Sequence, residues 1–236
     1  KEQDGGVWSK WPADIAKRQK RAMKQWADDL RDAVELQKFG QFLFYKQWLE
    51  LKAYANSQGI QIIGDIPIFV AYDSADVWSH PDLFYLNKDG SASVVAGVPP
   101  DYFSETGQRW GNPLYRWDKM AADNYGWWAQ RIHMNLVQSD IARIDHFRGF
   151  AGYWEIPATE ETAVKGQWVD GPGIPFFEAI QQRMGDLPII AEDLGVITPE
   201  VEELRDRFAF PGMKILQFAF GGEQNSDFLP FNYVPN

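Results

Sequence analysis

Apolar residues recur every three or four positions near the start of the chain. In residues 13–57 this pattern begins at Ile15, passes Trp26 and continues through Phe42 with further aromatic and aliphatic side chains. One face of an α-helix brings such positions together. Gly59 follows the pattern, and glycine is common just after the last helical residue. The pattern therefore predicts two helices within residues 13–57.

After Gly59 the pattern changes to short β-branched runs that alternate with helical ones. The predicted strands are residues 60–70, 140–147, 187–194 and 213–220, and the predicted helices are 122–138, 176–184 and a segment that follows Thr198. Alternating strands and helices indicate a parallel sheet. An open doubly wound sheet and a (β/α)8 barrel both fit, but polar residues at the carboxyl ends of the strands favour the barrel. We therefore expect an α/β fold in which residues 1–236 form part of a (β/α)8 TIM barrel catalytic domain with inserted loop subdomains.

The longest insertion is predicted at residues 71–118, which are irregular and rich in Asp, Pro, Gly and aromatic residues. A connection of this length is usually functional or forms a small subdomain. Residues 149–175 are a second loop-rich insertion. Aromatic residues make up 15% of the chain. Composition alone favours a core role for them, whereas those in polar loops would suit flat ligands such as sugar rings.

The composition also excludes several classes of protein. The chain carries 23 Lys and Arg against 33 Asp and Glu, a net charge of −10, and such a surface repels phosphate backbones. No apolar run approaches the roughly 18 residues that cross a bilayer, and no secretory leader is visible. The chain has no cysteine, which excludes disulfides and thiolate chemistry. We therefore expect no nucleic-acid partner, no membrane partner and a cytoplasmic location.

Three predicted strands end in an acidic residue, namely Asp65, Asp145 and Glu192. Parallel neighbouring strands would bring these ends to one rim. Arg143 shares a face with Asp145 because strand side chains alternate, and a neighbouring guanidinium would hold a nucleophilic carboxylate ionised. A general acid at Glu192 must instead keep its proton, which an apolar wall or the charge of Asp145 would favour. Two carboxyls about 5–5.5 Å apart perform retaining glycoside chemistry.

Two other interpretations of these acids remain open. Acidic residues at strand ends often cap the next helix or pair with a neighbouring cation. A metal site is the second alternative, and its ligands would be Asp65, Asp145, His146 and Glu192. No close pair of histidines supports a metal site, so we expect none.

Four segments resemble the 4-α-glucanotransferases called amylomaltases or disproportionating enzymes, a family of the α-amylase clan. They are GDIPIFVAYDSADVW at residues 64–78, PPDYFSETGQRWGNP at 99–113, RIDHFRG at 143–149 and AEDLG at 191–195. One such segment would be weak evidence, but four in the family's order are specific. The resemblance extends over most of the chain after residue 60.

The resemblance implies a retaining transfer of α-1,4-glucan segments without a cofactor. It implies Asp145 as the nucleophile and Glu192 as the acid/base residue. The residues implied to bind substrate are Asp65, Arg143 and His146 on the donor side, and Asp101, Tyr102, Phe103, Gln108 and Trp110 on the acceptor side. The glucans would be maltooligosaccharides, starch or glycogen-derived dextrins. The implied location is cytoplasmic, or plastidial in a plant.

The family has a third catalytic carboxylate, in a His-Asp pair that we expect beyond Asn236. We therefore expect the chain to be a fragment that is inactive alone, although its full-length parent would be active. Two alternatives to a transferase remain open. One is a hydrolase of the α-amylase type, and the other is a glucan-binding fragment without catalytic activity.

Overall fold

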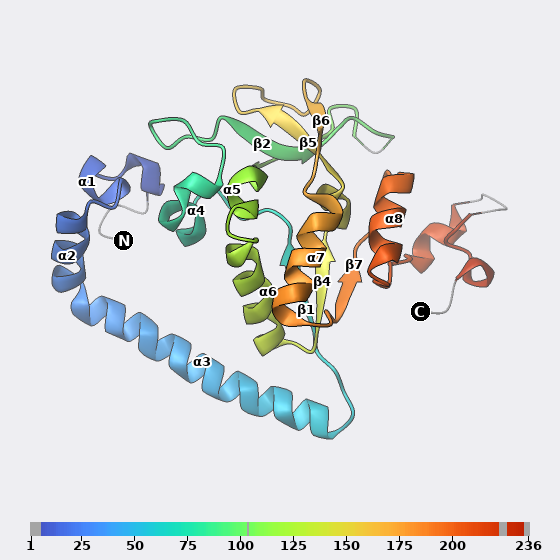
Figure 1. Cartoon of the computed structure of the whole chain (residues 1–236), viewed down its shortest axis with the longest axis horizontal. Coiled ribbons are helices and arrows are strands. Elements are labelled where there is room, and N and C mark those ends of the chain that lie inside the picture. Colours follow the sequence, from blue (N-terminus) through green and yellow to red (C-terminus); the bar gives the residue numbers. More distant parts are fainter. Residues whose placement is uncertain (1–5, 103, 222–225, 234–236) are drawn as a thin grey trace. The chain divides into compact units, whose positions relative to one another are not determined.

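The computed structural model describes residues 6–102, 104–221 and 226–233 (Figure 1). The chain divides into two compact units. The first consists of Lys1–Ile62, Phe69–Gly126 and Trp154–Val169, and the second consists of Ile63–Ile68, Trp127–Tyr153 and Asp170–Asn236. Within the described residues, no helix combines the length and the apolar character needed to cross a membrane.

The second unit contains a three-stranded parallel sheet in the order β1-β4-β7. Its strands are β1 (Ile63–Pro67), β4 (Ile141–Asp145) and β7 (Ile189–Ala191). Helices α6 (Gly126–Gln138), α7 (Gly173–Met184) and α8 (Pro199–Arg207) alternate with them along the chain. In Figure 1, α6 and α7 lie side by side over this sheet. The three strands predicted at residues 60–70, 140–147 and 187–194 are thus confirmed, each shorter than expected.

Aromatic rings form the core of the second unit. Trp128 of α6 and Phe176 of α7 meet edge to face at 5.6 Å between ring centroids, and Phe150 lies 4.7 Å from Phe176. Phe147 and Phe177 join them at 5.5 Å, and all five rings are fully buried. Burying each ring contributes about 1.5–3 kcal/mol. These aromatic residues are therefore part of the core, as the composition favoured.

Helix α6 lies close against β1 because residue 64 is glycine. A Cβ atom on Gly64 would lie 2.6 Å from the side-chain oxygens of both Asn135 and Ser139. Asn135 also donates to the backbone oxygen of Asp65 at 3.1 Å. Arg131 donates to the backbone oxygens of residues 67 and 68, at 2.6 and 3.1 Å. These bonds fix the carboxyl end of β1, from which the Asp65 side chain projects.

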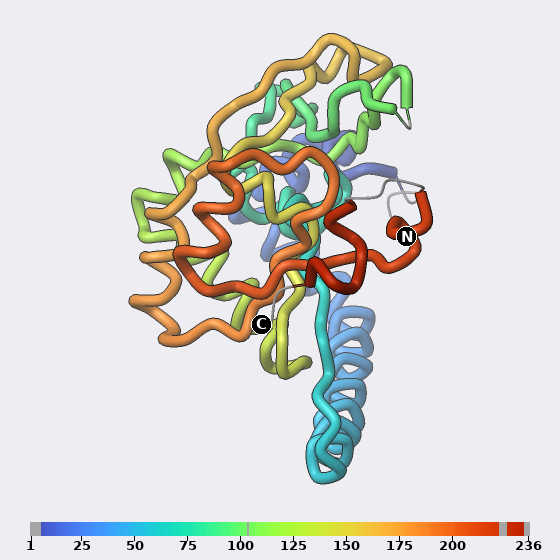
Figure 2. The backbone as a smooth tube through the Cα atoms, turned by 90° about the vertical axis from the view of Figure 1, so that its right-hand side faces the viewer, coloured from blue at the N-terminus to red at the C-terminus, as the bar shows by residue number. Residues whose placement is uncertain are grey.

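The first unit begins with α1 (Ala13–Ala16), α2 (Lys20–Asp29) and α3 (Arg31–Ser57), where two helices were predicted. Figure 1 shows α3 as one long continuous helix, which is seen foreshortened in Figure 2, and none of its residues is buried. The insertion at residues 71–118 is less irregular than expected. It contains α4 (Ala75–Ser79), β2 (Val94–Val98) and β3 (Gln108–Pro113), and it ends within α5 (Trp117–Ala121).

Strands β2 and β3 belong to a four-stranded sheet that falls largely in the first unit. Its order is β3-β2-β5-β6, with β5 at Gly152–Pro157 and β6 at Gln167–Asp170. β2 pairs antiparallel with both β3 and β5. The predicted loop at residues 149–175 therefore contributes two strands to this sheet.

The prediction of a fourth strand at residues 213–220 is wrong. Leu216–Phe220 form a 3₁₀ helix, and the turn closes through hydrogen bonds from Phe218 N to Ile215 O (3.0 Å) and from Gly221 N to Phe218 O (3.3 Å). A short continuous apolar run fits a strand or a helical turn equally well, because it lacks a periodicity that separates them.

Candidate active site

The end of β4 carries an arginine between two carboxylates. Arg143 donates from one terminal nitrogen to Asp145 at 2.7 Å and from the other to Asp65. The pairing of β1 with β4 explains this arrangement, because it sets Asp65 opposite Arg143. Ala142 and Ile144, which alternate with Arg143 and Asp145, are fully buried on the other face of the strand. Strand periodicity thus places the charged side chains together.

Electrostatics favour the charged form of Arg143. Partial burial opposes the charge, but the hydrogen bond and charge of Asp65, together with those of Asp145, outweigh it and raise the pKa of Arg143. Asp65 and Asp145 remain partly exposed, at 54% and 44% of their side-chain surfaces. The two carboxylates are therefore open to a ligand while Arg143 holds them in place.

Glu192 directly follows β7, and backbone groups hold its carboxylate. The amide of His146 donates to Oε2 at 2.8 Å, and the amide of Leu194 donates to Oε1 at 3.1 Å. Burial is the largest influence and raises the pKa of Glu192. The two amide bonds act against this shift, whereas the negative charge of Asp145 adds to it. Glu192 is thereby biased towards keeping a proton, as a general acid requires.

Backbone hydrogen bonds bring the end of β4 onto Glu192. The amide of Glu192 donates to Ile144 O at 3.0 Å, and the amide of Phe147 donates to Glu192 O at 3.1 Å. The His146 amide that binds the Glu192 carboxylate is bonded covalently to Asp145. Asp145 and Glu192 therefore occupy adjacent positions at the ends of neighbouring parallel strands.

His146 has an unusual backbone conformation. Its φ and ψ are 55° and 47°, in the left-handed region that few residues other than glycine adopt. In this conformation its amide donates to Oε2 of Glu192. Burial, with a smaller contribution from the charge of Arg148, lowers the pKa of the His146 side chain to about 4. The imidazole is therefore neutral at pH 7.

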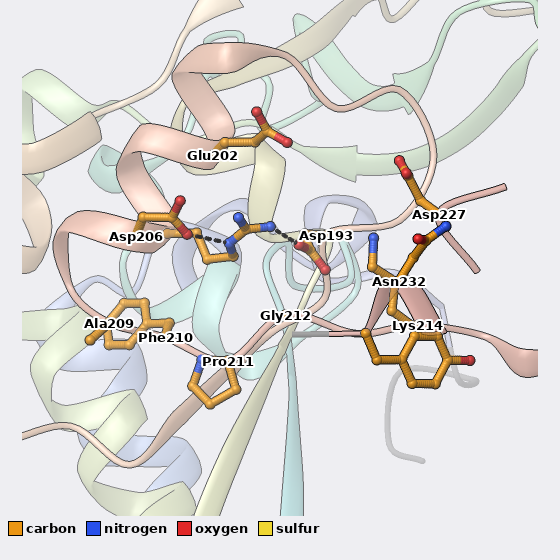
Figure 3. A pocket seen from close by; sticks show the side chains of 12 residues that line it. Asp193, Glu202, Asp206, Ala209, Phe210, Pro211, Gly212, Lys214, Asp227 and Asn232 are labelled. Carbon is orange, nitrogen blue, oxygen red and sulfur yellow. Dashed lines mark hydrogen bonds and ion pairs between the residues drawn. The ribbon is translucent and has the colours of Figure 1, made fainter. Parts of the chain in front are cut away.

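Asp193, which follows Glu192, anchors the neighbouring helix and loop and lies outside the proposed pair of carboxylates. Its buried carboxylate binds Arg205 of α8 at 2.5 Å and accepts from the amide of Met213 at 2.7 Å. Figure 3 shows this ion pair beside an open pocket of about 690 Å³ that Gly212 also lines. Sequence reasoning missed Met213, whose sulfur accepts from Nε of Arg143 at 3.3 Å. Nothing in the local sequence signals a contact across 70 residues.

The residues expected on the acceptor side lie in the first unit. Tyr102 is 97% exposed, and Trp110 donates to the Gln108 side chain at 3.1 Å at the start of β3. The Asp101 carboxylate accepts from the amide of Ser104 at 2.8 Å. Phe103 lies outside the described residues. Asp65, Arg143, Asp145, His146 and Glu192 are brought together in the second unit.

The arrangement in the second unit suits the chemistry of two carboxylates. Asp145 lies beside a guanidinium, and Glu192 lies in a half-buried site that favours its protonated form. One can attack a carbon atom while the other protonates the departing oxygen. Among the described residues, no three or more His, Asp or Glu side chains are placed to hold a metal ion.

Comparisons with known proteins show the family to which the chain belongs. Residues 1–236 match the model of glycoside hydrolase family 77, which is described as 4-alpha-glucanotransferase. A 4-alpha-glucanotransferase of Thermus thermophilus is 55% identical over 230 residues, which are 97% of this chain and 46% of that protein. The chloroplastic/amyloplastic 4-alpha-glucanotransferase of Solanum tuberosum is 48% identical over 97% of this chain and 40% of that protein.

A solved structure shows the same fold. The amylomaltase of Streptococcus agalactiae, determined in complex with acarbose, matches with a TM-score of 0.95 and 43% identity, over 99% of this chain and 48% of that chain. The α/β fold is therefore part of a TIM barrel, as predicted. The chain spans about half the length of the relatives it matches. Because the family model matches every residue, the chain belongs to the 4-alpha-glucanotransferases of glycoside hydrolase family 77.

Proposed function

We propose that this chain supplies the nucleophile and the acid/base residue of a 4-α-glucanotransferase, an enzyme that also needs the half present in its relatives. The observation that carries the proposal is the juxtaposition of Asp145, paired with Arg143 at 2.7 Å, and Glu192, whose pKa is raised. Its substrates are α-1,4-glucans such as maltooligosaccharides and starch. The proposed location is the cytoplasm of a bacterium, or a plastid.

The proposed reaction has two displacements. An Asp145 oxygen bonds to C1 of the donor sugar as the glycosidic bond breaks, and Glu192 transfers its proton to the departing oxygen. Glu192 then removes the proton from the 4-hydroxyl of an acceptor glucan, whose oxygen attacks C1 and releases Asp145. Two inversions at C1 give net retention.

Asp65, Arg143 and His146 are proposed to surround the donor sugar. Arg143 touches both neighbouring carboxylates, so it can keep their oxygens directed at the sugar while it balances their charge. On the acceptor side we propose Asp101, Tyr102, Phe103, Gln108 and Trp110. Aromatic faces stack on sugars and exclude water, which favours transfer to a glucan over hydrolysis.

The test uses a chimera in which this chain replaces the matching half of the Thermus thermophilus relative. The chimera is incubated with maltotriose, and the products are separated by length. We expect glucose together with a ladder of longer maltodextrins and little net gain of reducing ends. Shorter sugars alone, with a steady gain of reducing ends, would show an α-amylase-type hydrolase and contradict the proposal.

Asp145→Asn in the same chimera tests the catalytic role. We expect the transfer rate to fall by at least about 10³, as for removal of nucleophiles elsewhere, with the melting temperature little changed. If the chimera has no activity to lose but still binds maltodextrin, the chain is a glucan-binding module without catalytic function.

A further inference from the structure

The contacts of Asp193 reach the proposed nucleophile through a neighbouring segment. Its side chain is only 4% exposed and accepts from two donors, Nη1 of Arg205 and the amide of Met213. Both partners are distant in sequence. A buried carboxylate with two good hydrogen bonds holds its partners rigidly, because moving either would leave a buried charge unpaired.

Gly212 shows how closely this segment approaches Asp193. A Cβ atom at residue 212 would lie 2.5 Å from one Asp193 oxygen and 2.9 Å from the other. The segment is also tied to β7, since the amide of Ala191 donates to Pro211 O at 2.8 Å. Residues 211–213 are thus held at both ends, by the β7 backbone and by the Asp193 carboxylate.

Met213 connects this segment to the proposed site. Its sulfur accepts from Nε of Arg143 at 3.3 Å, while the two terminal nitrogens of Arg143 bind Asp65 and Asp145. Three partners therefore fix the guanidinium plane. Two of these partners, Asp65 and Asp145, are the partly exposed carboxylates of the site. Met213 therefore supplies the contact that connects the guanidinium to residues 211–213.

We propose that Asp193 and Met213 are positioning residues, which hold the Arg143 guanidinium in the orientation that presents Asp145 to the donor sugar. This inference rests on the proposed function. Arg205 forms an ion pair with Asp193, and Asp193 accepts a hydrogen bond from the Met213 amide. The Met213 sulfur in turn accepts from Nε of Arg143. Asp206 is a natural control, because it binds the same Arg205 at 2.7 Å but its side chain is 66% exposed, whereas that of Asp193 is 4% exposed.

The test isolates the nucleophilic step by using α-maltosyl fluoride as the donor. Bond formation from Asp145 to C1 expels fluoride with its electron pair, and no proton from Glu192 is needed. The first-turnover release of fluoride is measured in the Thermus thermophilus chimera and its variants, together with KM and the melting temperature.

Because a thioether sulfur is a weak acceptor, loss of this hydrogen bond predicts that Met213→Leu slows fluoride release about three- to tenfold, with KM changed less than about twofold. Met213→Gln, which restores an acceptor on a chain of similar length, should recover most of the rate. Asp193→Asn should slow release at least as much as Met213→Leu, and Asp206→Asn should not slow it.

The outcomes separate the two proposals. If the unmodified chimera neither transfers glucan nor releases fluoride, the proposed function fails, and this inference fails with it. If the chimera is active but Met213→Leu releases fluoride at the unmodified rate, or Met213→Gln is no better than Met213→Leu, only the positioning role is overturned. A purely structural role would lower the melting temperature and leave fluoride release by the folded protein unchanged. Met213→Leu keeps the test decisive even if Asp193→Asn fails to fold.

Discussion

The left-handed backbone at His146 leads to a prediction about the acid/base residue. With φ at 55°, the amide of His146 donates to Glu192 at 2.8 Å. Asn tolerates this conformation, whereas a β-branched residue does not. His146→Asn and His146→Val both remove the imidazole, so the difference between these two variants isolates the backbone.

The expected difference follows from the cost of the left-handed conformation. That cost is about 1–2 kcal/mol for a residue with an ordinary Cβ, so the Val variant should melt about 2–8 °C below the Asn variant when the 236 residues unfold together. If the Val backbone instead relaxes, Glu192 loses a hydrogen bond that favours its charged form, and its pKa rises further. The basic limb of the kcat/KM profile should then move to higher pH in His146→Val.

The assay compares the two variants in the Thermus thermophilus chimera, by thermal melting and by maltotriose transfer from pH 4 to pH 9. The unmodified chimera provides the reference for both measurements. Equal melting temperatures together with superimposable basic limbs would refute the reasoning, because they would show that the backbone at residue 146 neither carries strain nor controls Glu192.

Three further predictions use the same chimera. Glu192→Gln should slow transfer from maltotriose by about 10²–10⁴ but spare fluoride release from α-maltosyl fluoride; equal losses on both donors would contradict the acid/base role. Gly64→Ala should lower the free energy of unfolding by about 1–3 kcal/mol, because the new Cβ atom would lie 2.6 Å from the side-chain oxygens of Asn135 and Ser139. Gly40→Ala, which meets nothing within 4 Å in α3, is the control in thermal melting and should not destabilise. Because His146 binds its proton more weakly when folded, with a pKa of about 4, the folded state should lose stability as pH falls from about 6.5 to 4. Melting temperatures of His146→Asn should fall less over that range, and parallel curves would contradict the assignment.

The sequence allowed the parallel strands and their acidic ends to be predicted for a physical reason. Ala142 and Ile144 must be buried, so strand alternation sends Arg143 and Asp145 to the opposite face. Parallel neighbours share one rim, which brings Glu192 to the same place. These are local rules combined with one topological rule, and both can be applied to a single sequence.

Other features depend on contacts that a local pattern does not contain. The apolar run at residues 213–220 looked like a strand, but the chain there closes a 3₁₀ turn instead. The contact between Met213 and Arg143, and the left-handed turn at His146, depend on how distant segments meet. The two strands within residues 71–118 were missed because the Pro, Gly and Asp residues around them obscured any alternation.

The residues proposed for the donor side and for the acceptor side belong to different compact units. Asp65, Arg143 and Glu192 are held by hydrogen bonds from residues of the second unit, whereas Gln108 and Trp110 begin a strand of the first. Under the proposed function, exchange of residues 99–113 would change the length of the products without changing the residues proposed to cleave the bond. If the proposed function holds, enzymes that make longer or shorter dextrins could be obtained by shuffling that segment among relatives.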